Sequence, residues 1–204
     1  MGRKTQITKE AMLEAAYEIL ENAGYGAVNI KTIAARVGCS TQPISWQFGN
    51  MQGLRRELYT FVAGKVWGGM ENLLTEKNAM EAFFETGKIY LSCAYDKPNV
   101  FRFLCVDDPG DILEWNCSIV ELFGNEPIKV MLAKELGLSR EIVDRIVADI
   151  IIYTHGLATI ILWDAINITK EEAYEMIFNH ANTYFSQYGI KVGDYVNYKP
   201  KLRL

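Results

Sequence analysis

Signals that start and stop helices alternate at short intervals along this sequence, and they constrain its fold more than any other feature. Thr8 and Asn29 are good N-cap residues directly before amphipathic runs, and Gly24 and Gly38 stand where those runs end. Apolar residues within each run recur three or four positions apart, as on one face of a helix. The alternation typical of strands is absent before the tail that begins near residue 189. We therefore expect an all-α fold.

The same signals continue through the rest of the chain. A helix from Met51 to about Leu74 carries the pair Gly68-Gly69, which predicts a bend because each glycine weakens a helix by roughly 1 kcal/mol. Thr169 and Glu172 form a capping box for the last helix. The full set of predicted helices covers about 9–23, 30–37, 40–48, 51–74, 79–95, 98–106, 111–123, 127–136, 140–165 and 170–188.

Two short predicted helices are joined by the turn VGCS, with Gly38 at its centre. Small residues at this turn allow the helices to approach closely, which is typical of a helix-turn-helix whose second helix enters the DNA major groove. The same pattern would also suit a three-helix corner of any all-α fold. From Ser40 to Leu54 there is no Lys or Arg, so the second helix would have to bind DNA without positive charge of its own.

Charge is distributed unevenly along the 204 residues. Residues 1–65 contain eight Lys and Arg against five Asp and Glu, whereas residues 66–204 contain thirteen against twenty. A small basic N-terminal part on a larger acidic part suits a DNA-binding head on an acidic body, although an overall charge of −4 hides this division.

The N-terminal region resembles the DNA-binding domain of the TetR family of bacterial transcriptional regulators. The resemblance covers about residues 7–60 and is carried by Ala15-Ala16, Ile19-Leu20, Gly24-Tyr25, Ile33-Ala34, Gly38, Ser40, Phe48 and Leu54. It implies a three-helix helix-turn-helix DNA-binding domain over residues 1–50. It also implies a larger helical domain over residues 51–204 that binds an effector and dimerises.

The resemblance places DNA contacts on the second helix of the motif and on neighbouring helix N-termini. The implied DNA-binding residues are Asn29, Lys31, Thr41, Gln42, Ser45, Trp46, Gln47 and Met51. Three places depart from the family pattern: Ser45 replaces a usual tyrosine, Gln47 replaces histidine or tyrosine, and GNMQ lacks the usual lysine. Gln can pair with adenine through two hydrogen bonds, and a Thr methyl or Trp face can contact a thymine methyl.

Other features of the head leave alternatives open. The Trp46 ring could pack into the core of the head instead of facing DNA. Phosphates could be bound by helix N-termini, helped by Arg3, Lys4, Lys9, Lys31, Arg55 and Arg56, although Arg36, Arg55 and Arg56 could equally be solvated surface charges. Pro43 has no N–H, so we expect Ser40 to cap the N–H of Gln42.

The region from 80 to 165 is rich in aromatic residues, and most of them will be ordinary core. As a set they suit a body that encloses a small apolar or aromatic effector. The candidate ligand-binding residues are Phe84, Tyr90, Phe103, Trp115, Tyr153 and His155. A histidine such as His155 is more often a satisfied core residue than a ligand contact.

The last two predicted helices, 140–165 and 170–188, would form a helical hairpin. In the family the equivalent pair forms a four-helix dimer interface, and Ile150–Trp163 is apolar nearly all round. Burial of this helix within a monomer is the alternative. The stretch Ile150–Trp163 is too short to span a bilayer, and MGRKTQITKE lacks the apolar core of a signal peptide, so we expect a cytoplasmic protein without a membrane partner.

Three classes of function follow from these features. The preferred one is a homodimeric regulator, a repressor released from a palindromic operator by a small molecule, with the 51–74 helix transmitting the change. A helical small-molecule binder or scaffold with a non-functional head is the second. An enzyme is the third, but no catalytic constellation, metal site or cofactor motif is visible, and the four cysteines form no CxxC pair.

Overall fold

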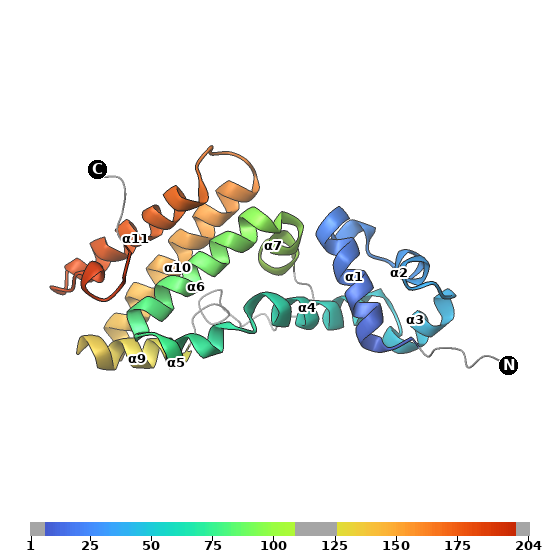
Figure 1. Ribbon diagram of the computed structural model, residues 1–204, viewed down its shortest axis with the longest axis horizontal. Helices are drawn as coiled ribbons and strands as arrows, with labels where there is room; N and C mark the ends of the chain where they lie inside the picture. Colours follow the sequence, from blue (N-terminus) through green and yellow to red (C-terminus); the bar gives the residue numbers. More distant parts are fainter. Residues whose placement is uncertain (1–6, 109–125, 199–204) are drawn as a thin grey trace. The chain divides into compact units, whose positions relative to one another are not determined.

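The computed structural model describes residues 7–108 and 126–198, and the regular structure in these two ranges is entirely helical (Figure 1). The predicted all-α fold is therefore confirmed. The helices are α1 (Lys9–Ala23), α2 (Ile30–Val37), α3 (Thr41–Phe48), α4 (Met51–Trp67), α5 (Leu73–Glu76), α6 (Ala79–Asp96), α7 (Pro98–Cys105), α9 (Glu126–Leu136), α10 (Arg140–Leu162) and α11 (Lys170–Ser186). Short 3-10 turns lie at Tyr25–Ala27, Met70–Asn72 and Val192–Asp194. The helix predicted over 111–123 lies outside the described residues.

Side-chain caps explain why the helices begin where they do. The Thr8 hydroxyl accepts from the Ala11 N–H at 3.1 Å, and Thr169 shares a full capping box with Glu172. Asn29 caps α2 through the N–H groups of Lys31 and Thr32. These caps confirm the predicted starts of α1, α2 and α11.

Backbone geometry explains where the early helices end. Gly38 adopts φ 75° and ψ 39°, the left-handed conformation that only glycine adopts without strain. The predicted interruption at Gly68-Gly69 is also confirmed, because α4 stops at Trp67 and a 3-10 turn follows.

The described chain forms two compact units, and α7 belongs to the first of them. The first unit consists of the chain up to Gly68 and a second segment that begins at Lys97 and contains α7. The second unit consists of Gly69–Asp96 together with the C-terminal part of the chain, which contains α9, α10 and α11. The predicted boundary between residues 50 and 51 separates a DNA-binding domain from an effector-binding domain, and it stays a prediction. In the packing of the structure, α4 and α7 belong to the same unit as the three N-terminal helices.

The core of the first unit is built from one face of each helix. α1 contributes Ala16 and Leu20, α2 contributes Ile33, and all three side chains are fully buried. α7 packs against α1 and α4, and its Phe103 ring stacks on Tyr25 at 4.9 Å between ring centroids.

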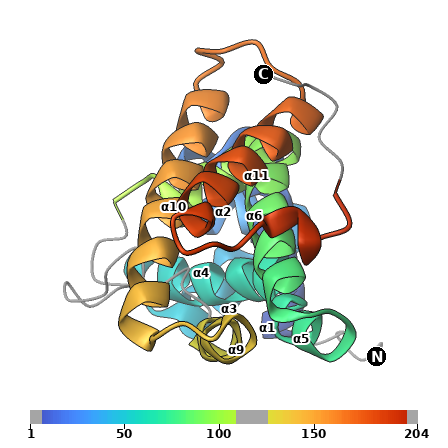
Figure 2. The same cartoon turned by 90° about the vertical axis from the view of Figure 1, so that its left-hand side faces the viewer.

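In the second unit α6, α10 and α11 pack against one another, and α9 packs on α6 and α10 (Figure 2). The tail folds back onto this unit: the Asn78 amide donates to the Tyr195 carbonyl at 2.8 Å, and Tyr198 packs on Phe84 and Phe178.

α10 is the most apolar of the described helices of the second unit. It has 23 residues and a mean hydropathy of 1.6 over its most apolar window, so by length and composition it could cross a membrane. The prediction that the apolar stretch is too short to span a bilayer was made for Ile150–Trp163 alone. The helix that contains this stretch is longer, because it begins at Arg140. Core helices of soluble proteins pass the same test. In this unit one side of α10 is buried, through Val143, Ile146, Val147 and Ile150 among others.

Candidate functional site

The helix α3 presents one buried face and one exposed polar face. Ile44 and Phe48 lie one turn apart and are 0% and 8% exposed, so they hold α3 against the core of the first unit. The opposite side exposes Thr41, Gln42, Trp46 and Gln47, and Ser45 is half-buried at its margin. Five of the predicted DNA-binding residues therefore lie on α3, four of them directed to solvent.

Trp46 is the most exposed large apolar side chain in the described residues, at 78%. Its ring does not pack into the core of the first unit, so the structure does not support that alternative. An exposed indole on this helix face suits stacking or methyl contacts with a partner.

The start of α3 has no side-chain cap. Ser40 occupies the N-cap position but makes no capping hydrogen bond, so the expectation that it caps Gln42 is wrong. An N-cap serine accepts from the N–H two or three positions into the helix, and here Pro43 removes the second of these donors. The N–H groups of Thr41 and Gln42 thus lie at an uncapped helix N-terminus, which is a favourable position for an anion.

The starts of α2 and α4 differ from that of α3. Asn29 Oδ1 accepts from the N–H groups of Lys31 and Thr32 at 3.0 and 3.1 Å, so this predicted DNA contact already serves as a cap. Asn50 caps α4 by accepting from the Gly53 N–H at 2.8 Å. Lys31 and Met51 are exposed beside these two caps.

Several cations that the sequence offers for phosphate binding are held by groups of the protein itself. Lys9 pairs with Glu57 at 2.8 Å, and Arg36 pairs with Glu18. Arg55 donates to the backbone carbonyl of Asp108 and lies over the Tyr25 ring. Lys31 and Arg56 are exposed. Arg3 and Lys4 lie outside the described residues.

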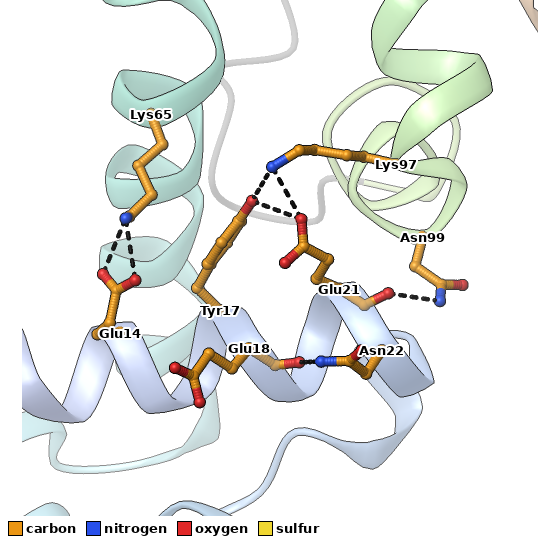
Figure 3. A network of polar contacts seen from close by, with 8 residues as sticks. All are labelled: Glu14, Tyr17, Glu18, Glu21, Asn22, Lys65, Lys97 and Asn99. Carbon is orange, nitrogen blue, oxygen red and sulfur yellow. Dashed lines mark hydrogen bonds and ion pairs between the residues drawn. The ribbon is translucent and has the colours of Figure 1, made fainter.

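Lys97 of the first unit is likewise held within the protein (Figure 3). Its Nζ lies 2.8 Å from a Glu21 carboxylate oxygen and donates to the Tyr17 hydroxyl at 2.6 Å. The Lys97 ammonium lowers the pKa of Glu21, so this carboxylate stays charged at neutral pH. Lys97 is therefore bound to α1.

Gly53 is a positioning residue that sequence reasoning missed. A Cβ atom at Gly53 would overlap the backbone carbonyl oxygen of Phe48, so the first turn of α4 fits against the end of α3 only without a side chain. The signal was present in GNMQGL, because a glycine inside a helical pattern costs about 1 kcal/mol relative to alanine and so indicates a packing constraint.

In the second unit the structure brings together two of the predicted ligand-binding residues. The Tyr90 hydroxyl on α6 and Nδ1 of His155 on α10 are joined by a hydrogen bond of 2.7 Å. Tyr90 is buried, and burial lowers the pKa of the half-buried His155, so its imidazole is neutral at neutral pH.

The remaining candidates are dispersed. Phe84 is buried against Phe178 and Tyr198, and Tyr153 stacks on His180 with 3.8 Å between ring centroids. Phe103 lies in the first unit, not in the body where the sequence places it, because α7 packs with α1 and α4. Trp115 lies outside the described residues.

Comparison with known families identifies the head. Residues 12–58 match the family described as bacterial regulatory proteins, tetR family, and the matched range contains α2, α3, most of α1 and the N-terminal part of α4. No curated protein sequence matches the chain. The match includes the uncapped, solvent-facing helix α3, the second helix of the helix-turn-helix. Residues 12–58 thus form a DNA-binding domain of the TetR family of bacterial transcriptional regulators.

Proposed function

We propose that this regulator is a cytoplasmic homodimeric repressor that binds a palindromic operator and is released by a small apolar or aromatic effector. The observation that carries the DNA-binding part is the exposed face of α3, which presents Thr41, Gln42, Trp46 and Gln47 and whose helix start has no side-chain cap. Amide and hydroxyl groups on such a face suit hydrogen bonding to base edges.

Phosphate binding falls to a small number of groups in this proposal. Among the described residues of the head, the open N–H groups of α3 and the side chains of Lys31 and Arg56 are accessible donors, whereas Lys9, Arg36 and Arg55 are paired within the protein. We therefore expect modest non-specific affinity and specificity that depends on direct base contacts.

A titration with DNA from the region flanking the gene tests this function. The protein should bind one such fragment against excess unrelated DNA. If Lys31 and Arg56 of each protomer neutralise phosphates, log affinity should fall with log salt with a slope of about −4. The measurement is fluorescence anisotropy at several salt concentrations. Binding that any unrelated competitor removes would contradict the proposal.

The effector site is proposed around Tyr90 and His155. A hydrogen-bonded polar pair with a buried Tyr90 suits a small-molecule site, where a few polar groups orient a mostly apolar ligand. The proposed release of the repressor from DNA depends on this effector site. An effector that binds one conformation of the protein more tightly shifts the population toward it and so changes the affinity for DNA.

Dimerisation is proposed through α10 and α11. Ile152, Ile160 and Trp163 are 58%, 46% and 57% exposed, and with Gly156 they follow one stripe that runs along α10 to its C-cap residue, Trp163, opposite the buried face of the helix. A second copy covering this stripe would bury it by two-fold symmetry.

Substituting this stripe tests the dimer. The double variant Ile152→Glu/Ile160→Glu should raise the dissociation constant of the dimer about 100-fold or more, because apolar interface anchors contribute about 2 kcal/mol or more each. Sedimentation velocity over a concentration series measures this. Val130→Glu on α9, also at an exposed apolar residue, is the control and should leave the dimer intact. A wild-type protein that sediments as a monomer would overturn this part of the proposal.

A further inference from the structure

The tail of the chain, residues 189–198, packs on the second unit after α11 (Figure 1). Its side chains Val192 and Val196 are 1% and 5% exposed. The Asn78 amide, directly before α6, donates to the Tyr195 carbonyl at 2.8 Å. The tail is thus fixed by buried side chains and a hydrogen bond as far as Val196. We call residues 189–198 the strap.

Beyond Val196 the strap ends in an aromatic contact. The Tyr198 ring lies 5.1 Å from the Phe84 ring of α6 and 5.1 Å from the Phe178 ring of α11, measured between centroids. Phe84 and Phe178 lie 5.6 Å apart in an edge-to-face arrangement, which aromatic rings prefer. With Tyr198 in place, these two phenylalanines are 6% and 5% exposed. We call the surface formed by Phe84 and Phe178 the aromatic site.

The polar end of the Tyr198 side chain has a defined partner as well. Its hydroxyl donates to the backbone carbonyl of Glu171 at 3.4 Å. Burial raises the pKa of Tyr198, and the carboxylates of Glu175 and Glu171 raise it further, so the phenol is neutral and can donate at neutral pH. The same carboxylates would repel an anionic ring. The aromatic site therefore suits a neutral phenol.

Tyr198 is held less firmly than the part of the strap before it. Val192 and Val196 are buried, whereas Asn197 is exposed and Tyr198 is half-buried. Segments with few buried contacts open locally at low free energy. Residues 197–198 can therefore leave the aromatic site while the two valines stay buried.

The aromatic site is separate from the proposed effector site. Phe84 and Tyr90 lie six positions apart on α6, so their side chains point about 120° apart around the helix. Tyr90 bonds to His155 of α10, whereas Phe84 contacts Phe178 of α11. A ligand at one of these places would not meet the groups of the other.

We propose that the aromatic site is a second small-molecule site, for neutral para-substituted phenols, and that Tyr198 occupies it as a built-in competitor. The side chain in the site shows what it accepts: an apolar ring against two phenylalanines, with a hydroxyl directed to the Glu171 carbonyl. A free phenol must displace Tyr198, so its binding releases the end of the strap. A tethered competitor has a high effective concentration, which weakens binding of the free phenol. The proposal does not depend on DNA binding.

Calorimetric titration of the full chain with p-cresol, which reproduces the tyrosine side chain, tests the proposal. Wild type should bind p-cresol, and Tyr198→Ala should bind it about tenfold or more tightly, because the open site is a minor state of about 10% at most in wild type. Tyr188→Ala, at another partly exposed tyrosine of the second unit, is the matched control and should bind like wild type. Equal affinity in wild type and Tyr198→Ala overturns the proposal, and so does absence of binding to wild type.

Two analogues of p-cresol test the chemistry of the site. Toluene lacks the hydroxyl and should bind wild type about twofold to tenfold more weakly, the range for one neutral hydrogen bond. p-Toluate carries a carboxylate and should not bind, because Glu171 and Glu175 lie nearby. If all three compounds bind equally, the protein takes up apolar rings without selection and the assignment to phenols is wrong.

Hydrogen exchange of wild type with saturating p-cresol tests displacement of the strap. The Tyr198 N–H donates to the Val196 carbonyl at 2.8 Å, so its exchange should become faster while the Val192 amide stays protected. Unchanged exchange at Tyr198 with p-cresol bound would show that the ligand sits elsewhere and would overturn the proposal.

Two further variants keep the test decisive. Tyr198→Phe preserves the ring contacts if Tyr198→Ala does not fold, and it should bind p-cresol about twofold or more tightly than wild type, because the competitor has lost its hydrogen bond. His155→Gln should leave p-cresol affinity unchanged. Loss of binding in His155→Gln would assign the ligand to the proposed effector site and overturn the second site. A chain that binds no DNA contradicts the proposed function and leaves this test intact.

Discussion

Replacing Gln42 and Gln47 together by alanine is expected to weaken operator binding by about 2 to 6 kcal/mol for each half-site, roughly 30-fold to 20,000-fold per protomer. Both side chains project from the exposed face of α3, and neither is part of the buried side formed by Ile44 and Phe48. The substitution therefore removes two amides that can pair with adenine and leaves the packing of α3 intact. Alanine also favours the helical conformation at both positions.

The measurement compares operator with unrelated DNA for wild type and variant. Affinity for unrelated DNA and its salt dependence should be nearly unchanged, because they depend on phosphate contacts. Gln187→Ala, an exposed glutamine of the second unit, is the control and should bind operator normally. Equal operator affinity for wild type and Gln42→Ala/Gln47→Ala would remove α3 from base recognition. That result would favour the alternative function, a helical small-molecule binder or scaffold whose head does not recognise a DNA sequence.

Gly53→Ala is expected to destabilise the first unit by about 1 to 3 kcal/mol, the usual cost of forcing an atom into occupied space. The new Cβ would overlap the Phe48 carbonyl oxygen, which is backbone and cannot rotate away. The end of α3 or the start of α4 must then shift. Because α3 carries the exposed polar face, operator affinity should fall together with stability.

Gly64→Ala in the same helix is the matched control. Nothing lies within 4 Å of a Cβ at Gly64, which is exposed in the interior of α4. The same substitution there should stabilise the protein by roughly 0.5 to 1 kcal/mol, since alanine favours a helix more than glycine. Urea unfolding followed by circular dichroism compares the two. Equal shifts of the same sign would show that the close approach at Gly53 has no energetic consequence.

Local chemistry was sufficient to predict most helix boundaries. Thr8, Asn29 and Thr169 cap the helices that the sequence assigns to them, and Gly38 ends α2 in the left-handed conformation. These features depend on residues within one turn of each other, so spacing along the chain suffices to find them. The one predicted cap that failed, Ser40, involves a proline at the third helical position, where the donor is missing.

Contacts between distant segments could not be predicted in this way. The sequence offers Lys9, Arg36 and Arg55 as cations for phosphate, yet their partners Glu57, Glu18 and Asp108 lie far along the chain. No spacing rule identifies such partners. Likewise, the sequence GNMQGL does not predict that Gly53 lies against the Phe48 carbonyl, although a glycine at this position indicates some steric constraint.

The sequence by itself determined the all-α fold and the helix-turn-helix, because caps, glycine stops and the apolar period are local properties of the chain, and its resemblance to the TetR family indicated the type of head. Only the tertiary structure decided that α7 packs with the head, which α3 side chains face solvent, and that Tyr198 packs against Phe84 and Phe178. An amphipathic pattern shows that a face is buried, but the helix that covers it is selected by packing across the whole fold.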